Sequence, residues 1–286
     1  MSSMPVDVEI QLSERPKFQL NLDSYMAPTG ANAKLKKISL TENPKIHTKV
    51  YKVFSDTDLK AQEAINYLYK NNFDENFLSR ILSVGVLGVK TNRKLVPTRF
   101  SITAIDDTIG KKLIETIKDY QTYGYAAYFG GYLGNYFLVL FFPEVWSYEL
   151  FEMYSPSNAG YLTPKYTTDY EDYYGRKTYA ENTAGGYYAA RIAVLEKLNE
   201  LKKQSSCMVL RFMTDEYSMP LGVWVVRQAT RKSLENKPIE FSSKELMLNY
   251  AKAVARKRFN LNIEHILKKS FLLKQIEHQS KLLKFL

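Results

Sequence analysis

The chain of 286 residues is 45% hydrophobic and 24% charged, a composition that indicates a globular protein with a sizeable core and excludes a disordered one. Its longest apolar run, residues 136–142, is far shorter than the roughly 20 residues of a membrane-spanning helix. A net charge of +10 favours a polyanionic partner such as nucleic acid. The alternative explanation of this charge is the Lys-rich, solvated surface of a thermophilic protein.

Strands and helices alternate in the predicted first third of the chain. Apolar and polar residues alternate over residues 6–12 and again over 18–22, the period of half-buried strands. A loop with Pro28 and Gly30 follows over 24–37, and another strand is expected over 46–53. Two helices are expected next, over 55–69 with Ser55 as the N-cap and over 74–82.

The middle of the chain is expected to hold the main strands. A strand is predicted over residues 99–105 and a helix over 109–120, with an Asp-Asp-Thr turn between them. A Gly- and Tyr-rich hairpin over 123–135 leads into the apolar strand over 136–142. Apolar residues at helical spacing predict a helix over 188–203.

Two further strands, over residues 208–213 and 222–227, precede helices over 243–258 and 263–278. The pattern predicts an α+β fold with strands dominant in the N-terminal and central parts and helices toward the C-terminus. We expect one compact body over residues 1–260, which could divide near 150–165, then a C-terminal helix over 261–278 and a tail over 279–286.

Cys207 is the only cysteine, so the chain cannot form an internal disulfide or a thiolate metal cluster. Residues 1–5 lack the charged start and apolar core of a secretory signal peptide. Both features predict a reducing, intracellular setting in the cytoplasm.

Residues 94–110 carry a family resemblance. The run Val-Pro-Thr-Arg-Phe-Ser-Ile-Thr-Ala over 96–104, followed by Asp-Asp-Thr over 106–108, resembles the archaeal Nre family of DNA-repair proteins, which usually has Trp in place of Phe100. Family members usually begin with a Cys-rich, zinc-ribbon-like segment. This sequence does not contain it, so the chain is either a shortened member of the family or a piece of a longer protein. Further runs that match the family pattern are residues 133–135, 146–149, 169–171, 185–191 and 222–227.

The last eight residues, 279–286, place a Gln, a Leu and a Phe-Leu pair at relative positions 1, 4, 7 and 8. This spacing resembles the peptide by which replication and repair proteins dock on the sliding clamp PCNA, and the family resemblance implies the same partner. One helical turn would present the apolar anchors to a groove on the clamp. The alternative is that the tail extends the apolar face of the preceding helix. The PCNA-binding residues would be Gln279, Leu282, Phe285 and Leu286.

Arg99, Asp106 and Asp107 are the candidate catalytic residues. The two carboxylates could bind Mg²⁺ or Mn²⁺ with a third carboxylate from residues 169–172, as in a metal-dependent nuclease or another enzyme that processes nucleic acids or nucleotides. The alternative is that Asp106 and Asp107 cap the following helix and that Arg99 forms a structural ion pair with one of them. The sequence leaves open whether the protein is an enzyme.

The leading hypothesis is a nucleoid-associated DNA-repair protein that PCNA recruits and that contacts DNA through its basic body, with other repair proteins as further partners. These contacts with DNA phosphates require the fold to bring together basic residues that are far apart in the sequence. The alternative is that these residues are scattered over the surface and form no binding site. The candidate nucleic-acid-binding residues are Arg93, Lys94, Arg99, Arg176, Lys177, Arg191, Arg227 and Arg231.

Overall fold

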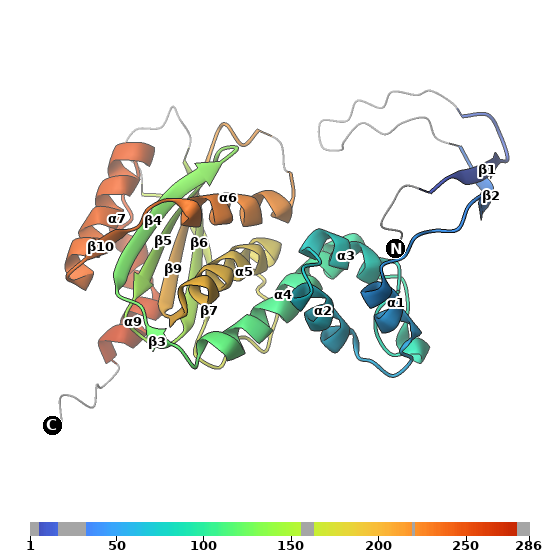
Figure 1. Cartoon of the computed structure of the whole chain (residues 1–286). Coiled ribbons are helices and arrows are strands. Elements are labelled where there is room, and N and C mark those ends of the chain that lie inside the picture. The colour runs from blue at the N-terminus through green and yellow to red at the C-terminus, as the bar shows by residue number, and fades with distance from the viewer. Residues whose placement is uncertain (1–5, 17–32, 156–162, 219–220, 279–286) are drawn as a thin grey trace.

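A computed structural model describes residues 6–16, 33–155, 163–218 and 221–278. Figure 1 shows a two-stranded ribbon near the N-terminus, a helical unit, and a layered part in which helices cover both faces of a sheet. The α+β fold predicted from the sequence is confirmed. No helix within the described segments combines the length and apolar character that crossing a lipid bilayer requires.

The N-terminal ribbon pairs β1 (Val8–Leu12) with β2 (Leu35–Leu40) in antiparallel fashion. The strand predicted over residues 6–12 is therefore confirmed. It is exposed along its whole length, however, so the expectation of a half-buried strand is wrong. The strand predicted over residues 18–22 lies outside the described residues.

Three helices and a short 3₁₀ helix form the helical unit around one apolar cluster. The strand predicted over residues 46–53 is wrong, because a helix begins at Thr48 and the His47 side chain caps it. The helix predicted from Ser55 begins six residues later, whereas the one predicted over 74–82 is confirmed. The elements are α1 (Thr48–Ser55), α2 (Ala61–Lys70), α3 (Glu75–Ser83) and η1 (Lys90–Asn92).

Helix α4 (Thr98–Ile117) joins the helical unit to the layered part (Figure 1). The predicted strand over residues 99–105 is wrong, because this segment and the helix predicted after it form one continuous helix about 30 Å long. Ile105 and Ile109 pack in the core of the helical unit, and Ile114 and Ile117 pack against the sheet. One helix thus contributes to both cores.

The sheet of the layered part has the strand order β10-β4-β5-β9-β6-β7. The pair β6–β9 is parallel, and the other neighbouring pairs are antiparallel. Two-residue strands β3 (Gln121–Thr122) and β8 (Lys203–Gln204) pair separately. The strands of the main sheet are β4 (Tyr125–Tyr132), β5 (Asn135–Phe142), β6 (Ser147–Ser155), β7 (Tyr166–Glu171), β9 (Ser206–Thr214) and β10 (Ile239–Phe241).

Burial on both faces of the sheet explains why the sequence of β5 is apolar without alternation. Phe137, Val139 and Phe141 face one apolar cluster, and the intervening residues face another on the opposite side of the sheet. A two-residue turn links β4 to β5, and both of its residues, Leu133 and Gly134, have the positive φ of a type I′ hairpin. The predicted hairpin and the strands over 136–142 and 208–213 are confirmed.

Helices cover both faces of the sheet. Helix α5 (Ala184–Leu201) and helix α6 (Val223–Glu235) pack on one face with the second half of α4. The strand predicted over residues 222–227 is wrong, because this segment begins α6. The opposite face is covered by α7 (Lys244–Phe259), α8 (Glu264–Lys269) and α9 (Phe271–His278). A single helix was predicted over residues 263–278, but a break at Ser270 divides this segment into α8 and α9.

The N-terminus of α9 is fixed to the sheet by a buried carboxylate. Glu149 on β6 is fully buried, and it accepts hydrogen bonds from the Ser270 hydroxyl at 2.5 Å and from the backbone N–H groups of Phe271 and Leu272 at 3.0 Å. A negative charge at this end also complements the helix dipole. Because Leu272 and Leu273 are buried beside this cap, α9 has a defined position on the sheet face.

Candidate functional site

Asp106 and Asp107 lie next to each other in the middle of α4, where they begin two separate sets of buried ion pairs. Neighbouring residues on a helix point about 100° apart, so the two carboxylates face different helices. The alternative in which Asp106 and Asp107 cap a helix is wrong, because α4 begins eight residues before Asp106. We call the two sets the Arg227 cluster and the Arg191 cluster.

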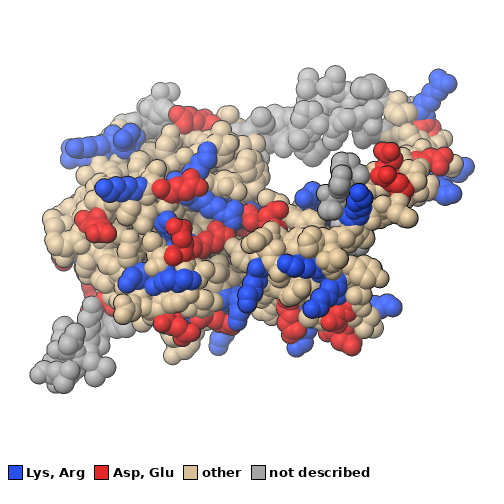
Figure 2. Space-filling model, in the orientation of Figure 1, with Lys and Arg blue, Asp and Glu red and all other residues tan. Residues whose placement is uncertain are grey.

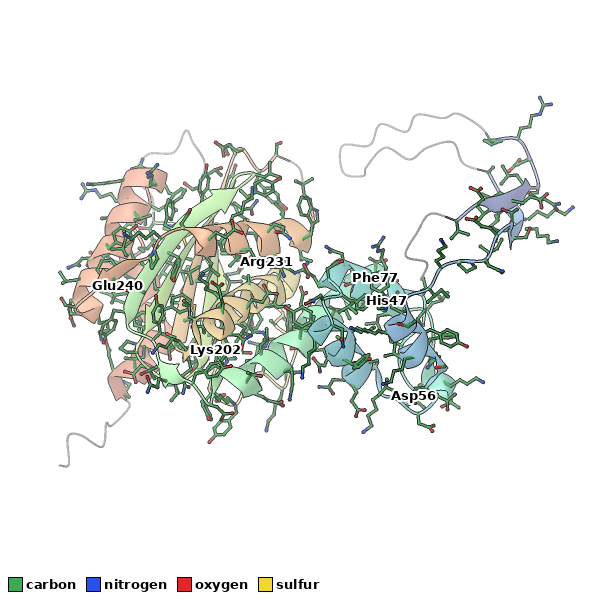
Figure 3. The ribbon with its side chains drawn as sticks, in the orientation of Figure 1. His47, Asp56, Phe77, Lys202, Arg231 and Glu240 are labelled. Carbon is green, nitrogen blue, oxygen red and sulfur yellow. The ribbon has the colours of Figure 1, made fainter. Side chains whose placement is uncertain are left out.

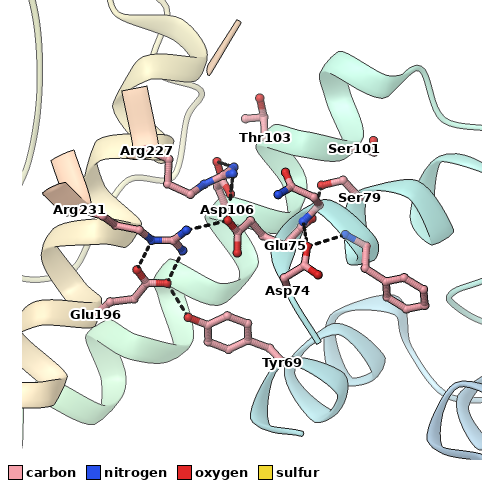
Figure 4. A network of polar contacts seen from close by, with 12 residues as sticks. Tyr69, Asp74, Glu75, Ser79, Ser101, Thr103, Asp106, Glu196, Arg227 and Arg231 are labelled. Atoms are coloured by element: carbon pink, nitrogen blue, oxygen red, sulfur yellow. Dashed lines mark hydrogen bonds and ion pairs between the residues drawn. The ribbon is translucent and has the colours of Figure 1, made fainter. Parts of the chain in front are cut away.

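The Arg227 cluster lies between the helical unit and the sheet layer (Figure 4). Nη2 of Arg227 donates to both carboxylate oxygens of Asp106 at 2.7 Å, and Nη1 donates to Oε1 of Glu75 at 3.2 Å. Arg227 and Asp106 are each 1% exposed. The Arg227 guanidinium therefore supplies hydrogen-bond donors to two buried carboxylates, one on α3 and one on α4.

Arg231 follows one helical turn after Arg227 and extends the same cluster. Its guanidinium donates to Oε1 of Glu75 at 2.8 Å and to both oxygens of Glu196 at 2.8 and 2.9 Å. The Tyr69 hydroxyl donates to Glu196 at 2.6 Å. The cluster therefore joins five helices, α2 to α6, and Figure 3 shows Arg231 on the side of the layered part that faces the helical unit.

Burial sets the protonation behaviour of the Arg227 cluster. It raises the pKa of Asp106 to about 6, although the Arg227 guanidinium acts in the opposite direction. Burial also acts to raise the pKa of Glu75, but the hydrogen bond and charge of Arg231, together with the charge of Arg227, leave that pKa below its usual value. The pKa of Tyr69 is raised by burial and by Glu196, so its hydroxyl remains a donor.

The raised pKa of Asp106 predicts a pH dependence of stability. The folded protein binds this proton more tightly than the unfolded chain, so the associated stabilisation is present below about pH 4 and is lost as the pH rises through 6. Relative to Asp106→Asn, which does not titrate, the wild-type free energy of unfolding should fall between pH 4 and pH 7. Urea unfolding of both proteins over this range measures the difference, and a difference independent of pH would contradict the prediction.

The Arg191 cluster lies deeper in the sheet layer. Arg191 on α5 is fully buried, and it donates to Oε2 of Glu171 and to Oδ1 of Asp107, both at 2.7 Å. The Trp146 indole N–H donates to the other oxygen of Glu171 at 3.2 Å. Gly110 on α4 leaves room for this guanidinium, because a Cβ there would lie 3.1 Å from Nη2 of Arg191 and the arginine would have to shift by a few tenths of an ångström.

The candidate catalytic residues are not gathered into one site. Both oxygens of Asp106 accept from Arg227, and those of Asp107 accept from Arg191 and Lys111. Arg99 is exposed at the start of α4, about 10 Å along the helix axis from Asp106, with its guanidinium 4.7 Å from the ring centre of Phe100. Across the residues that the structure describes, no three His, Cys, Asp or Glu side chains are grouped to hold a metal ion.

Most of the candidate phosphate-contacting residues have internal partners. Arg191, Arg227 and Arg231 belong to the two clusters, and Arg191 and Arg227 are inaccessible. Arg93 donates to three backbone carbonyl groups, and Arg176 pairs with Asp169 at 3.1 Å. Three of the eight remain exposed: Lys94 and Arg99, which are five residues apart near the start of α4, and Lys177, which lies on a distant segment of the sequence.

A different basic surface is present on the C-terminal helices. Residues 244–278 hold eight Lys and Arg against three Asp and Glu, a net charge of +5 and half of the excess of the whole chain. Two adjoining hollows of about 490 and 390 Å³, which share Lys252 and Glu264, lie over α7, α8 and α9. The basic C-terminal surface, as we call it, comprises the basic residues that line these hollows: Lys252, Arg256, Lys257, Lys268 and Lys274.

This surface is not among the sites predicted from the sequence, although the excess of Lys and Arg along the predicted C-terminal helices indicates it. Lys252 and Arg256 are four residues apart and so share one side of α7, and Lys268 and Lys269 are the last two residues of α8. On the face shown in Figure 2, by contrast, basic and acidic side chains are interspersed.

Comparison with known proteins identifies the family. The family model described as archaeal Nre, N-terminal, matches residues 1–159, and that described as archaeal Nre, C-terminal, matches residues 171–285. The DNA repair protein NreB of Archaeoglobus fulgidus is 37% identical over 274 residues, which are 95% of this chain and 68% of that protein. The DNA repair protein NreA of the same organism is 40% identical over 84% of this chain and 61% of its own length.

The DNA repair protein NreA of Haloferax volcanii is 38% identical over 82% of this chain and 58% of that protein. The chain thus spans 58% to 68% of the length of these three relatives. No solved structure matches it. Two family models in sequence order and this level of identity agree with the resemblance carried by residues 96–108, and the chain belongs to the archaeal Nre family.

Proposed function

We propose that this protein acts in DNA repair, that the sliding clamp PCNA recruits it through residues 279–286, and that its basic C-terminal surface contacts DNA. The names of its relatives support the repair role. The clamp contact rests on the spacing of Gln279, Leu282, Phe285 and Leu286, which lie outside the described residues. The proposed place of action is the nucleoid.

The position of α9 is the observation that carries this proposal. The octapeptide begins at the residue after His278, where α9 ends, and Glu149 and two buried leucines fix α9 to the sheet. A peptide that docks on a partner next to a fixed helix holds the body of the protein close to that partner. Tethering of this kind raises the local concentration of the body, so a weak contact with DNA is sufficient.

The proposed DNA contact uses the charge next to this tether. A sliding clamp encloses DNA, so a body held on the clamp by residues 279–286 is close to the duplex. The basic C-terminal surface belongs to the same three helices that lead to the tail. Lysine and arginine side chains that contact phosphates release counterions, which gives affinity without sequence preference.

Deletion of residues 279–286 tests the clamp contact. Binding of purified archaeal PCNA to the intact chain, measured by titration calorimetry, should be lost in the deleted chain. The thermal unfolding of the body should not change, because Leu272 and Leu273, which hold α9 on the sheet, are retained. Clamp binding that persists in the deleted chain with equal affinity would overturn this part of the proposal.

A second prediction concerns DNA affinity. Replacing Lys257, Lys268 and Lys274 with Ala should weaken binding to duplex DNA at least tenfold and reduce the slope of log K against log salt by about 2 to 3. Fluorescence anisotropy at several salt concentrations measures both quantities. The matched control removes three exposed lysines from the helical unit, Lys60, Lys70 and Lys90. Equal losses in the two triple variants would show a general charge effect and contradict a contact at the C-terminal helices.

A further inference from the structure

The phenyl ring of Phe271 is presented to solvent at the start of α9. Phe271 is 60% exposed, whereas the two leucines that follow it, Leu272 and Leu273, are buried. The backbone N–H of Phe271 donates to Glu149 at 3.0 Å, so that carboxylate already occupies this end of the helix. The ring therefore has a fixed attachment to the sheet layer, although most of its surface is outside the core.

A second ring and a lysine lie next to Phe271. The ring centres of Phe271 and Tyr170, which is on β7, are 6.1 Å apart, and the two planes meet at 30°. The Tyr170 hydroxyl donates to Gln275 on α9, which holds the two elements together. Nζ of Lys274 lies 5.9 Å from the centre of the Phe271 ring. We call Phe271 and Tyr170 the aromatic platform.

The aromatic platform adjoins the basic C-terminal surface through Lys274. Lys274 and Lys268 line the hollow of about 490 Å³, whose apolar lining is Leu248, Leu267 and Leu273. Within the described segments of the chain, neither lysine forms a salt bridge. Their charges are therefore available to an anionic partner that lies beside the exposed ring.

We propose that the aromatic platform stacks an unpaired base of DNA, while Lys268 and Lys274 contact the phosphates next to that base. A duplex keeps its bases stacked on one another, so a ring on the protein surface gains nothing from them. An unpaired strand offers both phosphates and free base faces, and aromatic rings beside lysines bind it. This inference rests on the DNA contact proposed above and specifies its substrate class, which is DNA with an unpaired strand beside a duplex.

The direction of α9 supports this assignment. Phe271, Lys274, Gln275 and His278 are spaced three, four and seven residues from the first, so they share one side of the helix, and all four are exposed. That side ends at the residue before the proposed clamp-docking segment, residues 279–286. A DNA strand that lies along it is held next to the clamp.

Three DNA probes separate base stacking from phosphate contacts. They are a duplex of about 20 base pairs, the same duplex with an overhang of about 12 thymidines, and a third with an overhang of equal length that has phosphates but no bases. Fluorescence anisotropy measures the affinity for each. The intact chain should bind the thymidine overhang at least about fivefold more tightly than the overhang without bases, because only the first supplies a base to stack.

Substitutions at Phe271 should remove this preference. Phe271→Ala and Phe271→Leu should bind the two overhangs alike and keep their duplex affinity within about twofold of the wild type, since the lysines remain. The leucine variant matters because it keeps an apolar side chain and lacks only the ring. The matched control Tyr51→Ala removes a ring that is also 60% exposed, from α1 in the helical unit, far from α9 in Figure 1. It should retain the preference.

Phe271→Trp reports stacking without reference to affinity. The thymidine overhang should quench the fluorescence of the introduced indole, and the overhang without bases should not. The wild-type protein, whose two tryptophans are Trp146 and Trp224, provides the background signal.

Two results would overturn this inference and leave the proposed DNA contact intact. One is duplex binding that depends on the lysines together with equal affinity of the wild type for the two overhangs. The other is a preference for thymidines that persists in Phe271→Ala. A wild-type protein that binds none of the three probes would instead overturn the DNA contact itself, and this inference with it.

Discussion

Replacing Arg227 with Ala should destabilise the protein by about 3 to 5 kcal/mol, the largest loss that we expect from a single substitution. Arg227 is 1% exposed, and its removal leaves the Asp106 and Glu75 carboxylates buried without the cation that faces them. Burying a charge without a partner costs far more than the net value of the ion pair that is lost. Urea unfolding monitored by circular dichroism measures the change.

The neighbouring Arg231 provides the matched control. It carries the same guanidinium one turn later on α6, but its side chain is 25% exposed and its main partner Glu196 is 24% exposed. Water can therefore solvate the groups that Arg231→Ala leaves behind, and the loss should be about half as large or less. Equal losses for the two variants would contradict the assignment of Arg227 as the centre of the cluster.

A double variant separates the charge from the packing. In Arg227→Met with Asp106→Asn, both the buried cation and its main counter-ion are removed while the volume is nearly kept. This variant should recover a large part of the stability lost in Arg227→Ala, since replacing a buried ion pair with uncharged groups is often close to neutral. If the double variant is less stable than Arg227→Ala, the loss comes from packing rather than from an unpaired buried charge.

The Arg227 cluster also explains why the helical unit and the sheet layer should unfold together. Besides the apolar contacts along α4, its ion pairs link α3 of the helical unit to α6 of the sheet layer through Glu75. If only one of the two parts unfolded, the ion pairs of Glu75 would break and buried charges would lose their partners. A single unfolding transition is therefore expected for the wild-type protein, and Arg227→Ala is the variant in which two transitions would become visible.

The sequence predicted best the elements whose burial leaves a simple pattern. Strand β5 is apolar on both faces and was predicted as a buried strand, and α7 was predicted from Ser243, which does cap it. Strands were predicted wrongly in place of α1, α4 and α6, whose N-terminal halves contain β-branched residues such as Val50, Ile102 and Val223. Such residues favour strands in isolation, and here tertiary packing overrides that preference.

The same errors concealed the ion-pair clusters. The strand predicted over residues 222–227 ends before Arg231 and gave no reason to place the two arginines together. On helix α6 their spacing of four places them side by side over Glu75. The partners of Arg227 are also 121 and 152 residues away along the chain, and no local pattern encodes a contact of that range. The family resemblance located the right segments but not their conformation.

The largest effect on binding is expected from the anchors of the tail. Leu282→Ala and Phe285→Ala should each weaken PCNA binding by at least about 30-fold, because an anchor that fills a pocket contributes about 2 kcal/mol or more. The adjacent Leu283→Ala removes the same side chain as Leu282→Ala at a position outside the docking pattern, and it should change the affinity less than threefold. Titration calorimetry with the purified clamp measures all three.

This comparison decides between the two interpretations of the tail. If residues 279–286 only extend the apolar face of α9, Leu282 and Leu283 should affect clamp binding alike, and their loss should lower the melting temperature instead. If the segment docks on PCNA, affinity depends on Leu282 and Phe285 while the body, held by Glu149 and the leucines of α9, melts unchanged. Because Leu282 and Leu283 are identical side chains, a difference between their variants can arise only from position, as docking in a defined register requires.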